Sequence, residues 1–170
     1  MGEIAVRARA SKATLYKLFD DQQALFTAVL VREVERRRGA ISEALRDPDP
    51  FEALRSAAYA MLDALDEQAV ELFRLVIAEG GRHPDIGRVF YAELVETAAA
   101  PISACLDVHL GCGPDAARTL ALQFVGAVKE PLFYPRLMGV PTGHDPVPVV
   151  DQVVRMTLSS ETFEVGEAVQ

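Results

Sequence analysis

The stretch IAVRARASKATLYKLFDDQQALFTAVL, residues 4–30, decides the expected fold of the N-terminal part of this chain. It has the pattern of a helix, a tight turn, a short helix and then a long helix. Ser11 is a favourable N-cap, because its hydroxyl can accept a hydrogen bond from an otherwise unpaired amide in the first helical turn. The sequence therefore predicts a short helix over residues 12–19.

The predicted short helix has two chemically different faces. On a 3.6-residue wheel Leu15, Leu18 and Phe19 fall on one side, where they can pack against the segment that precedes the turn. The opposite side carries ammonium, hydroxyl and phenol groups, which can reach phosphate oxygens and base edges in a major groove. This is the outline of a helix-turn-helix. The candidate DNA-contacting residues are Ser11, Lys12, Ala13, Thr14, Tyr16 and Lys17.

The charge is distributed unevenly along a chain whose net charge is −8. Residues 1–38 hold eight Lys or Arg against five Asp or Glu, whereas residues 39–170 hold nine against twenty. A basic end on an acidic body suits a protein that presents that end to a polyanion and repels it elsewhere. The run RRR at residues 36–38 fits equally well as cations that end a solvated helix.

Three segments resemble a known family. SKATLYKLF, residues 11–19, resembles the recognition helix of TetR/AcrR-type transcriptional regulators, while QALFTAVL and EIAVRARA resemble their helices 4 and 2. The resemblance implies an all-α protein with a truncated helix-turn-helix head at residues 1–38. A helical effector-binding and dimerisation domain follows at residues 39–170. The implied function is a transcriptional regulator, expected to be a repressor, that an unknown small-molecule effector releases from DNA.

Three departures from the family pattern bear on DNA binding. The chain begins inside the segment that matches helix 2, so the first helix of the head is expected to be absent. Arg9 and Ala10 occupy the turn where the family commonly has a Gly, which tolerates a positive φ. Gln22 stands where the family commonly offers a Lys to a phosphate. These departures leave an alternative open, a dimeric ligand-binding or protein-interaction module that no longer binds DNA competently.

The rest of the sequence has helical periodicity and clear helix boundaries. The long helix that starts at residue 22 is expected to end at Arg38 or to continue past Gly39 to Leu45. The segment DPDP, residues 47–50, then breaks the chain, because Pro lacks an amide donor and disfavours helical geometry in its predecessor. Further helices are expected at residues 50–66, 69–79 and 84–110, followed by two apolar stripes within residues 117–128 and 150–158.

The two stripes in the last third of the chain fit either a dimer interface or an internal core. In TetR-type proteins the last two large helices pair with their copies in a second subunit. The resemblance therefore implies a homodimer that reads a pseudopalindromic operator in double-stranded DNA. An intrachain core explains either stripe equally well. The candidate interface residues are Ala117, Leu120, Ala121, Phe124, Val125, Val128, Val150, Val153, Val154, Thr157 and Leu158.

The resemblance also implies a cavity among helices 5 to 8 of the family, whose occupant shifts helix 4. An apolar helical stripe is the ordinary signature of packing, so a plain core is the alternative for each candidate effector contact. These candidates are Tyr59, Leu62, Phe73, Ile77, Phe90, Tyr91 and Phe124.

The composition gives little support to other classes of protein. Cys105 and Cys112 form no disulfide or zinc pattern, and structural thiols explain them better than a redox switch. The three His are scattered, and no nucleophile is spaced to pair with a base, so neither an enzyme nor a metal or cofactor site is expected. No signal-peptide core is recognisable, and no apolar run approaches about 20 residues. We therefore expect a cytoplasmic protein with no membrane partner.

Overall fold

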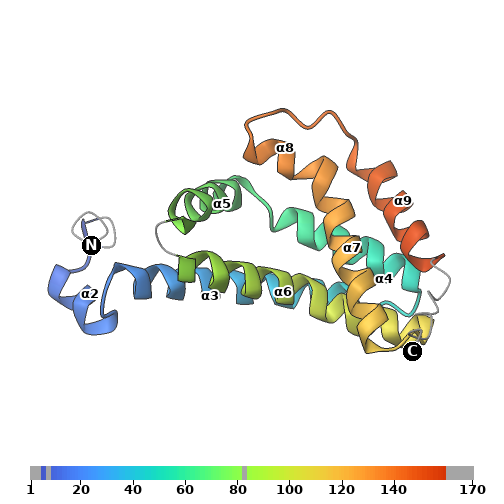
Figure 1. Ribbon diagram of the computed structural model, residues 1–170, viewed down its shortest axis with the longest axis horizontal. Coiled ribbons are helices and arrows are strands. Elements are labelled where there is room, and N and C mark those ends of the chain that lie inside the picture. The colour runs from blue at the N-terminus through green and yellow to red at the C-terminus, as the bar shows by residue number, and fades with distance from the viewer. Residues whose placement is uncertain (1–4, 7–8, 82–83, 160–170) are drawn as a thin grey trace, which may run out of the picture.

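Helices and the turns between them make up the described part of the chain. The structure is a computed structural model that describes residues 5–6, 9–81 and 84–159. No strand occurs among these residues, so the predicted all-α fold class is confirmed. In chain order the helices are α2 Lys12–Leu18, α3 Gln22–Ala44, α4 Pro50–Asp63, α5 Glu67–Gly80, α6 Pro84–Leu110, α7 Pro114–Leu132, α8 Tyr134–Leu137 and α9 Pro146–Leu158 (Figure 1). Within α3 the description covers the backbone alone at positions 22–23, 26, 30 and 33–37, which include the Gln22 side chain.

Asp side chains begin three helices of the body. The side-chain oxygens of Asp49, Asp66 and Asp145 accept hydrogen bonds of 2.9, 2.9 and 3.0 Å from amides in the first turns of α4, α5 and α9. Pro50 and Pro146 follow two of these caps, where the missing Pro amide would have no helical partner. Part of the acidic excess of the body therefore serves to start helices.

Two long helices lie side by side and set the shape of the molecule. Helices α3 and α6 run along its long axis, and α2 lies at one end of α3, away from the other helices (Figure 1). Around this pair, α4 packs on α3 and α9, α7 packs on α6 and α9, and α5 packs on α6 and α8. An ion pair of 2.9 Å between Arg55 Nε and Asp151 Oδ1 joins α4 to α9.

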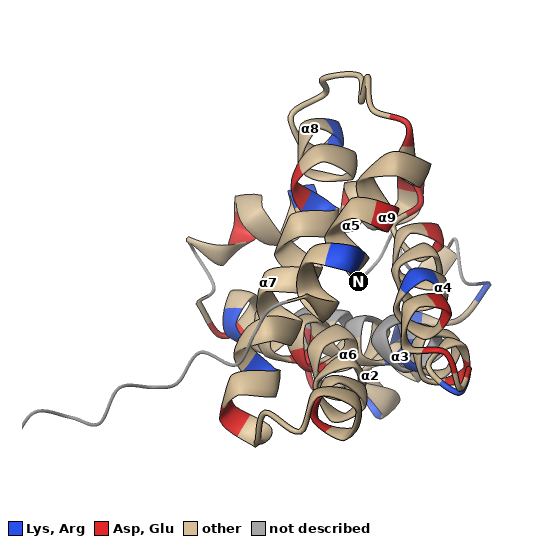
Figure 2. Cartoon of the chain, turned by 90° about the vertical axis from the view of Figure 1, so that its right-hand side faces the viewer, with Lys and Arg blue, Asp and Glu red and all other residues tan. Residues whose placement is uncertain are grey.

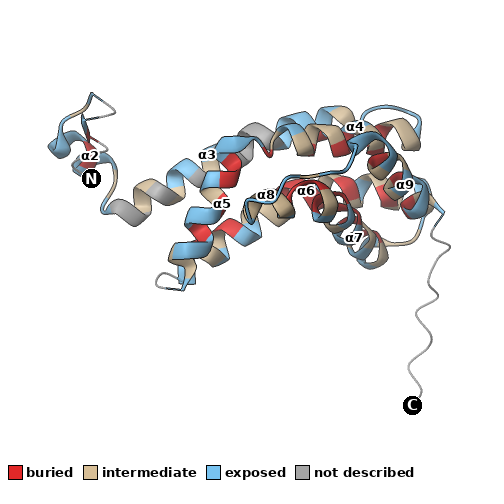
Figure 3. Ribbon diagram, turned by 90° about the horizontal axis from the view of Figure 1, so that it is seen from above, coloured by how far each residue is buried: buried red, intermediate tan, exposed pale blue. Residues whose placement is uncertain are grey.

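The interior of the body is divided into two apolar clusters. The main core gathers side chains of α4, α6, α7 and α9, together with Ile41 of α3. The second core lies between α5, α6 and the start of α8, where the rings of Phe90 and Phe133 each meet Phe73 edge-on at 4.9 Å between centroids. Buried residues concentrate in the body, and α2 is exposed over most of its surface (Figure 3).

The long helix α3 connects the two parts of the molecule without a break. It runs through Gly39 to Ala44, so the longer of the two expected helices is the correct one, and the predicted domain boundary at residue 38 falls inside it. Ile41 is buried in the main core, whereas Val29 nearer the head is exposed. With a rise of about 1.5 Å per residue, this helix spans roughly 35 Å.

Helix α6 is long and apolar enough to cross a membrane, judged by length and composition alone. It packs instead along α3, α5 and α7 in the middle of the body. Its side chains supply both cores, with Ile102 and Leu106 in the main core and Phe90 in the second. This packing accounts for part of the apolar composition of α6, whereas Tyr91 and Val108 of the same helix are exposed.

Candidate functional site

The first turn of α2 is held by the residue expected to cap it. The Thr14 amide donates a hydrogen bond of 3.0 Å to Ser11 Oγ, and the two side-chain hydroxyl oxygens lie 2.7 Å apart. Both residues are exposed. The predicted N-cap at Ser11 is confirmed.

The outer surface of α2 carries the polar residues that the sequence predicted for it. Lys12, Ala13, Tyr16 and Lys17 are exposed, whereas Leu15 alone is buried within this helix. Leu18 was expected on the packed face and is 68 % exposed, so that expectation is wrong. The helix is only seven residues long, and Leu18 is its last residue. The six candidate DNA-contacting residues thus lie together at the free end of the molecule.

The turn that leads into α2 contains a strained residue. Arg9 has a φ of 51°, in the left-handed region that favours Gly, and its amide donates to the Val6 carbonyl at 3.2 Å. The next amide, of Ala10, donates to the Ala5 carbonyl at 3.0 Å and closes the turn. A side chain in this conformation costs about 1–2 kcal/mol. The expected departure from a Gly turn is therefore seen as strain at Arg9.

Replacing Arg9 by Gly should raise the local stability of the head by up to about 1 kcal/mol. The relieved strain of about 1–2 kcal/mol exceeds the entropic cost of about 0.5–1 kcal/mol that a Gly adds. Hydrogen exchange at the Leu15 amide, which donates to the Ser11 carbonyl, measures the effect. Ala10→Gly is the matched control and should lower protection, because Ala10 has no positive φ. Equal or lower protection in Arg9→Gly would contradict the strain.

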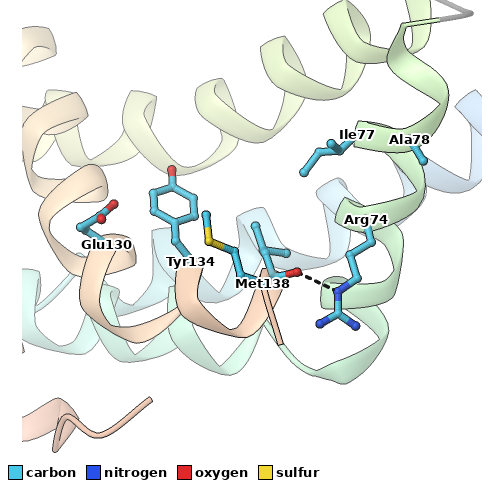
Figure 4. A pocket seen from close by; sticks show the side chains of 7 residues that line it. Arg74, Ile77, Ala78, Glu130, Tyr134 and Met138 are labelled. Carbon is cyan, nitrogen blue, oxygen red and sulfur yellow. Dashed lines mark hydrogen bonds between the residues drawn. The ribbon is translucent and has the colours of Figure 1, made fainter. Parts of the chain in front are cut away.

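A groove of about 470 Å³ opens on the body between α5, α7 and α8 (Figure 4). Beside the groove, hydrogen bonds from two arginines hold α8 against the body. Arg74 Nη2 and Nε donate to the Arg136 and Leu137 carbonyls at 2.7 and 3.0 Å, and Arg136 Nη1 donates to the Leu65 carbonyl at 2.6 Å. The groove is lined by Arg74, Ile77, Ala78, Glu130, Tyr134, Leu137 and Met138.

The polar wall of this groove is a phenol beside a carboxylate. Burial raises the pKa of Tyr134, and the nearby Glu130 and Tyr91 raise it further. The phenol therefore stays protonated at neutral pH and can donate a hydrogen bond. The described lining of the groove comes from α5, α7, α8 and the residue after α8.

A second, smaller cavity of about 20 Å³ lies in the interior, where the two cores meet. It brings together residues of α3, α4, α6 and α7 and of the turn after α4. Two polar side chains face it. Lys129 is only 5 % exposed and Thr97 only 3 %, and Thr97 Oγ1 has no hydrogen-bond partner among the described residues. The cavity is lined by Ile41, Met61, Ala64, Leu65, Leu94, Thr97, Ala98 and Lys129.

The residues predicted to contact an effector are spread over four places. Phe73 and Phe90 belong to the second core, and Ile77 lines the groove, while Tyr91 is exposed. The other three, Tyr59, Leu62 and Phe124, belong to the main core or pack against it. None of the seven lines the cavity beside α3. Five of the seven therefore pack in or against a core, whereas Ile77 and Tyr91 do not.

Sequence reasoning missed Lys129 and Thr97. Lys129 follows Val125 by four positions and so lies at the edge of the buried face of α7, next to Val128. A charged residue placed by helical spacing on an apolar face is the signal that could have identified it. Thr97 gives no comparable signal, because a buried Thr commonly bonds to its own helix.

Most of the predicted dimer-interface residues lie inside the body of the single chain. Eight of them are buried where α7 and α9 pack on α4 and α6: Ala117, Ala121, Phe124, Val125, Val128, Val150, Val154 and Thr157. Leu120, Val153 and Leu158 are partly buried beside them. The apolar side chains that these helices expose are Leu122 on α7 and Val147 and Met156 on α9.

The two described cysteines form neither a disulfide nor part of a metal-binding group. Cys105 and Cys112 are both free thiols and half-buried. Burial raises the pKa of Cys105, which lowers its thiolate fraction and its reactivity. Among the described residues no group of three His, Cys, Asp or Glu is placed to hold a metal ion.

Comparisons with known proteins agree on fold and family. Residues 52–160 match a family described as the C-terminal domain of AefR-like transcriptional repressors. A solved structure from Mesorhizobium loti MAFF303099, titled as a TetR-family transcriptional regulator, matches with a TM-score of 0.79 and 23 % identity. That match covers 92 % of this chain and 83 % of the other, and at this identity it establishes the fold. No curated protein matches the sequence.

Proposed function

Because this chain belongs to the TetR family of transcriptional regulators, we propose that it is a homodimeric, cytoplasmic DNA-binding repressor released by a small-molecule effector. The observation that carries the proposal is the exposed polar face of α2, joined by the continuous α3 to a cavity in the body. Binding of the chain to duplex DNA across a salt series tests it, because phosphate contacts give a steep salt dependence.

The DNA-binding part of the proposal assigns α2 to the major groove. Lys12 and Lys17 supply ammonium groups for phosphates, Thr14 and Tyr16 supply hydroxyls, and Ala13 allows close approach. The charge distribution supports the orientation, since the basic excess lies within residues 1–38. The end of the body opposite α2 carries Asp and Glu on α4, α7 and α9, together with the arginines Arg55, Arg118 and Arg155, while residues 39–170 as a whole have an acidic excess (Figure 2). DNA is therefore attracted to the head and repelled by the far end.

The dimeric part of the proposal uses the outer faces of α7 and α9. These helices pack on one another and together expose Leu122 and Met156, which are 40 % and 62 % exposed. Gly126 lies one turn beyond Leu122, and a Cβ added there would meet no described atom within 4 Å outside its neighbours and its own helix backbone. A small residue on an outer face allows a partner helix to approach closely. Two copies related by a two-fold axis would carry two heads for the halves of a palindrome.

Replacing Leu122 and Met156 together by Glu should convert the dimer to a monomer. Two carboxylates per subunit, four in all, would face one another in an apolar contact, where unpaired charge is strongly unfavourable. Sedimentation velocity measures the mass. Leu75→Glu is the matched control, because Leu75 on α5 is 47 % exposed and away from α7 and α9. A double variant that still sediments as a dimer would move the interface elsewhere.

The effector part of the proposal assigns the ligand to the internal cavity rather than the outer groove. A ligand changes an equilibrium only through a difference in affinity between two states. The cavity includes Ile41 of α3, so an occupant there interacts directly with the helix that positions α2. Among the described residues, the lining of the groove between α5, α7 and α8 includes none from α3.

A second candidate function is a dimeric ligand-binding module that does not bind DNA. The strain at Arg9 and the exposure of Leu18 favour it, because both make the head less stable. Under this alternative the body still binds ligand and dimerises. A chain that forms a dimer but shows no salt-dependent binding to duplex DNA would support this second function over the first.

A further inference from the structure

The groove between α5, α7 and α8 has the size of a small-molecule site and an apolar wall. Its volume of about 470 Å³ lies within the range of about 300–1,000 Å³ that is typical of ligand pockets. Ile77 of α5 and Met138, the residue after α8, come from opposite sides of it and are 67 % and 81 % exposed (Figure 4). Large apolar side chains that are exposed around a concavity mark a binding surface. The groove therefore offers a place for the apolar part of a ligand.

The end of the groove at α7 carries a carboxylate beside aromatic rings. Glu130 is exposed, and its side chain makes no ion pair or hydrogen bond with another described residue. Tyr134 lies next to it (Figure 4), and Tyr91 of α6 is close enough that Tyr91 and Glu130 both raise the pKa of Tyr134. A carboxylate attracts a cation by its charge, and the face of an aromatic ring attracts one by its quadrupole. This end of the groove therefore favours a positively charged group.

Arg74 does not reverse this preference, although it is the only cation in the described lining of the groove. Its Nε and Nη2 donate to the Leu137 and Arg136 carbonyls at 3.0 and 2.7 Å. It also lies across the groove from Glu130 (Figure 4). The guanidinium is thus held by α8, whereas the Glu130 carboxylate is available to a ligand. The acidic excess of residues 39–170, twenty Asp or Glu against nine Lys or Arg, favours the approach of a cation to the body.

We propose that this groove binds a small amphipathic organic cation, with its positive head at Glu130 and Tyr134. The apolar part of the cation lies against Ile77, Leu137 and Met138. A quaternary ammonium head, which has no N–H to donate, suits ring faces better than a compact and strongly hydrated ammonium. The site is separate from the effector cavity of the proposed function, since none of the described residues lines both. Binding at this groove does not require that the chain binds DNA.

Calorimetric titration of the full chain with octyltrimethylammonium and with octyl sulfate tests the proposal. The two probes share a chain length and carry heads of opposite charge. We expect the cation to bind at least about 5-fold more tightly than the anion. Glu130→Gln, which keeps the shape of the side chain, should weaken the cation by about 2- to 5-fold and strengthen the anion. Glu43→Gln is the matched control and should change neither affinity, because Glu43 is an exposed carboxylate on α3 outside the groove.

Variants of the groove walls separate the two parts of the ligand. Tyr134→Leu removes the ring and should weaken the cation by about 2- to 5-fold, whereas Tyr134→Phe keeps the ring and should retain the affinity. Ile77→Ala should weaken both probes by about 2- to 3-fold, because both carry the octyl chain.

Tyr134→Trp gives a direct signal from the groove, because the sequence contains no Trp. Trp is the best aromatic partner for a cation, so this variant should bind octyltrimethylammonium at least as tightly as the wild type. Its fluorescence should change during the titration with the same midpoint as the calorimetric signal. Tyr16→Trp is the matched control and should show no change, because Tyr16 is 49 % exposed on α2, which lies away from the other helices.

Three results would overturn the proposal: equal affinity for the two probes, a preference for the cation that survives Glu130→Gln, or a Tyr134→Trp fluorescence that does not respond to the cation. Duplex DNA binding is measured separately, so salt-dependent DNA binding without a cation preference would overturn only the groove site. A cation preference that Glu130→Gln reduces, in a chain that does not bind DNA, would support the groove site and overturn the repressor.

Discussion

Replacing Phe133 by Ala should lower the free energy of unfolding by about 3–5 kcal/mol. Phe133 is fully buried, and its ring packs edge-on against Phe73 in the second core. The substitution removes the transfer free energy of a phenyl ring and leaves a cavity that the surrounding structure fills only in part. Because Phe133 lies between α7 and α8, its loss also weakens the attachment of α8. Urea unfolding followed by circular dichroism measures the loss.

A matched apolar truncation on the surface provides the control for Phe133→Ala. Ile77 lines the groove on α5 and is 67 % exposed, so Ile77→Ala should change stability by well under about 1 kcal/mol. A loss of less than about 1 kcal/mol for Phe133→Ala would mean that the second core collapses without cost. The division of the body into two tightly packed clusters would then be wrong.

The double replacement of Lys12 and Lys17 by Ala should weaken duplex binding by about 100-fold or more at low salt. Each lysine that neutralises a phosphate releases counterions, so the slope of log affinity against log salt should fall by about one for each lost contact. A dimer carries two copies of each lysine. The expected fall in slope is therefore about four. Fluorescence anisotropy with a labelled duplex across a salt series measures both quantities.

Two further variants define the source of that effect. Tyr16→Ala should weaken binding and leave the salt slope unchanged, because a phenol carries no charge at neutral pH. Arg46→Ala removes an exposed cation at the body end of α3 and should change neither quantity. The dimer should persist in all three variants. An unchanged salt slope in the Lys12 and Lys17 double variant would remove α2 from the interface.

Most helix boundaries could be predicted because their determinants are local. Ser11 and Asp49 cap helices through bonds that span only two or three residues, and a Pro after Asp49 fixes the first turn of α4. The continuation of α3 through Gly39 was left open by the sequence. It is decided by packing, since Ile41 beyond the Gly is buried in the main core. A local propensity of about 1 kcal/mol against Gly is outweighed there by burial.

The candidate site was less predictable, because an apolar pattern in the sequence predicts that a residue is buried but not which element it packs against. Val128 and Val154 lie on regular apolar stripes, and a stripe in a core and a stripe in a dimer interface have the same spacing. The structure assigns both residues to the interior of one chain. Thr97 and Lys129 are far apart in the sequence, and only the packing of α6 on α7 brings them to one cavity.

Under the proposed function, α3 is the coupling element between ligand and DNA. Its N-terminal end carries α2, and its C-terminal end supplies Ile41 to the cavity and to the main core. A rigid helix of this length converts a small shift at one end into a change of distance between two heads in a dimer. The coupling is meaningful only if the heads bind DNA.

Selection of sites from a pool of random duplex DNA by this chain, at about 50 and about 200 mM salt, tests that claim most directly. We predict enrichment of an inverted repeat whose half-sites lie one helical turn, or a multiple of it, apart, with enrichment falling steeply at the higher salt. The Lys12→Ala and Lys17→Ala double variant should enrich no sequence. A wild-type chain that enriches no inverted repeat at either salt concentration would contradict the account and leave the body as the functional part.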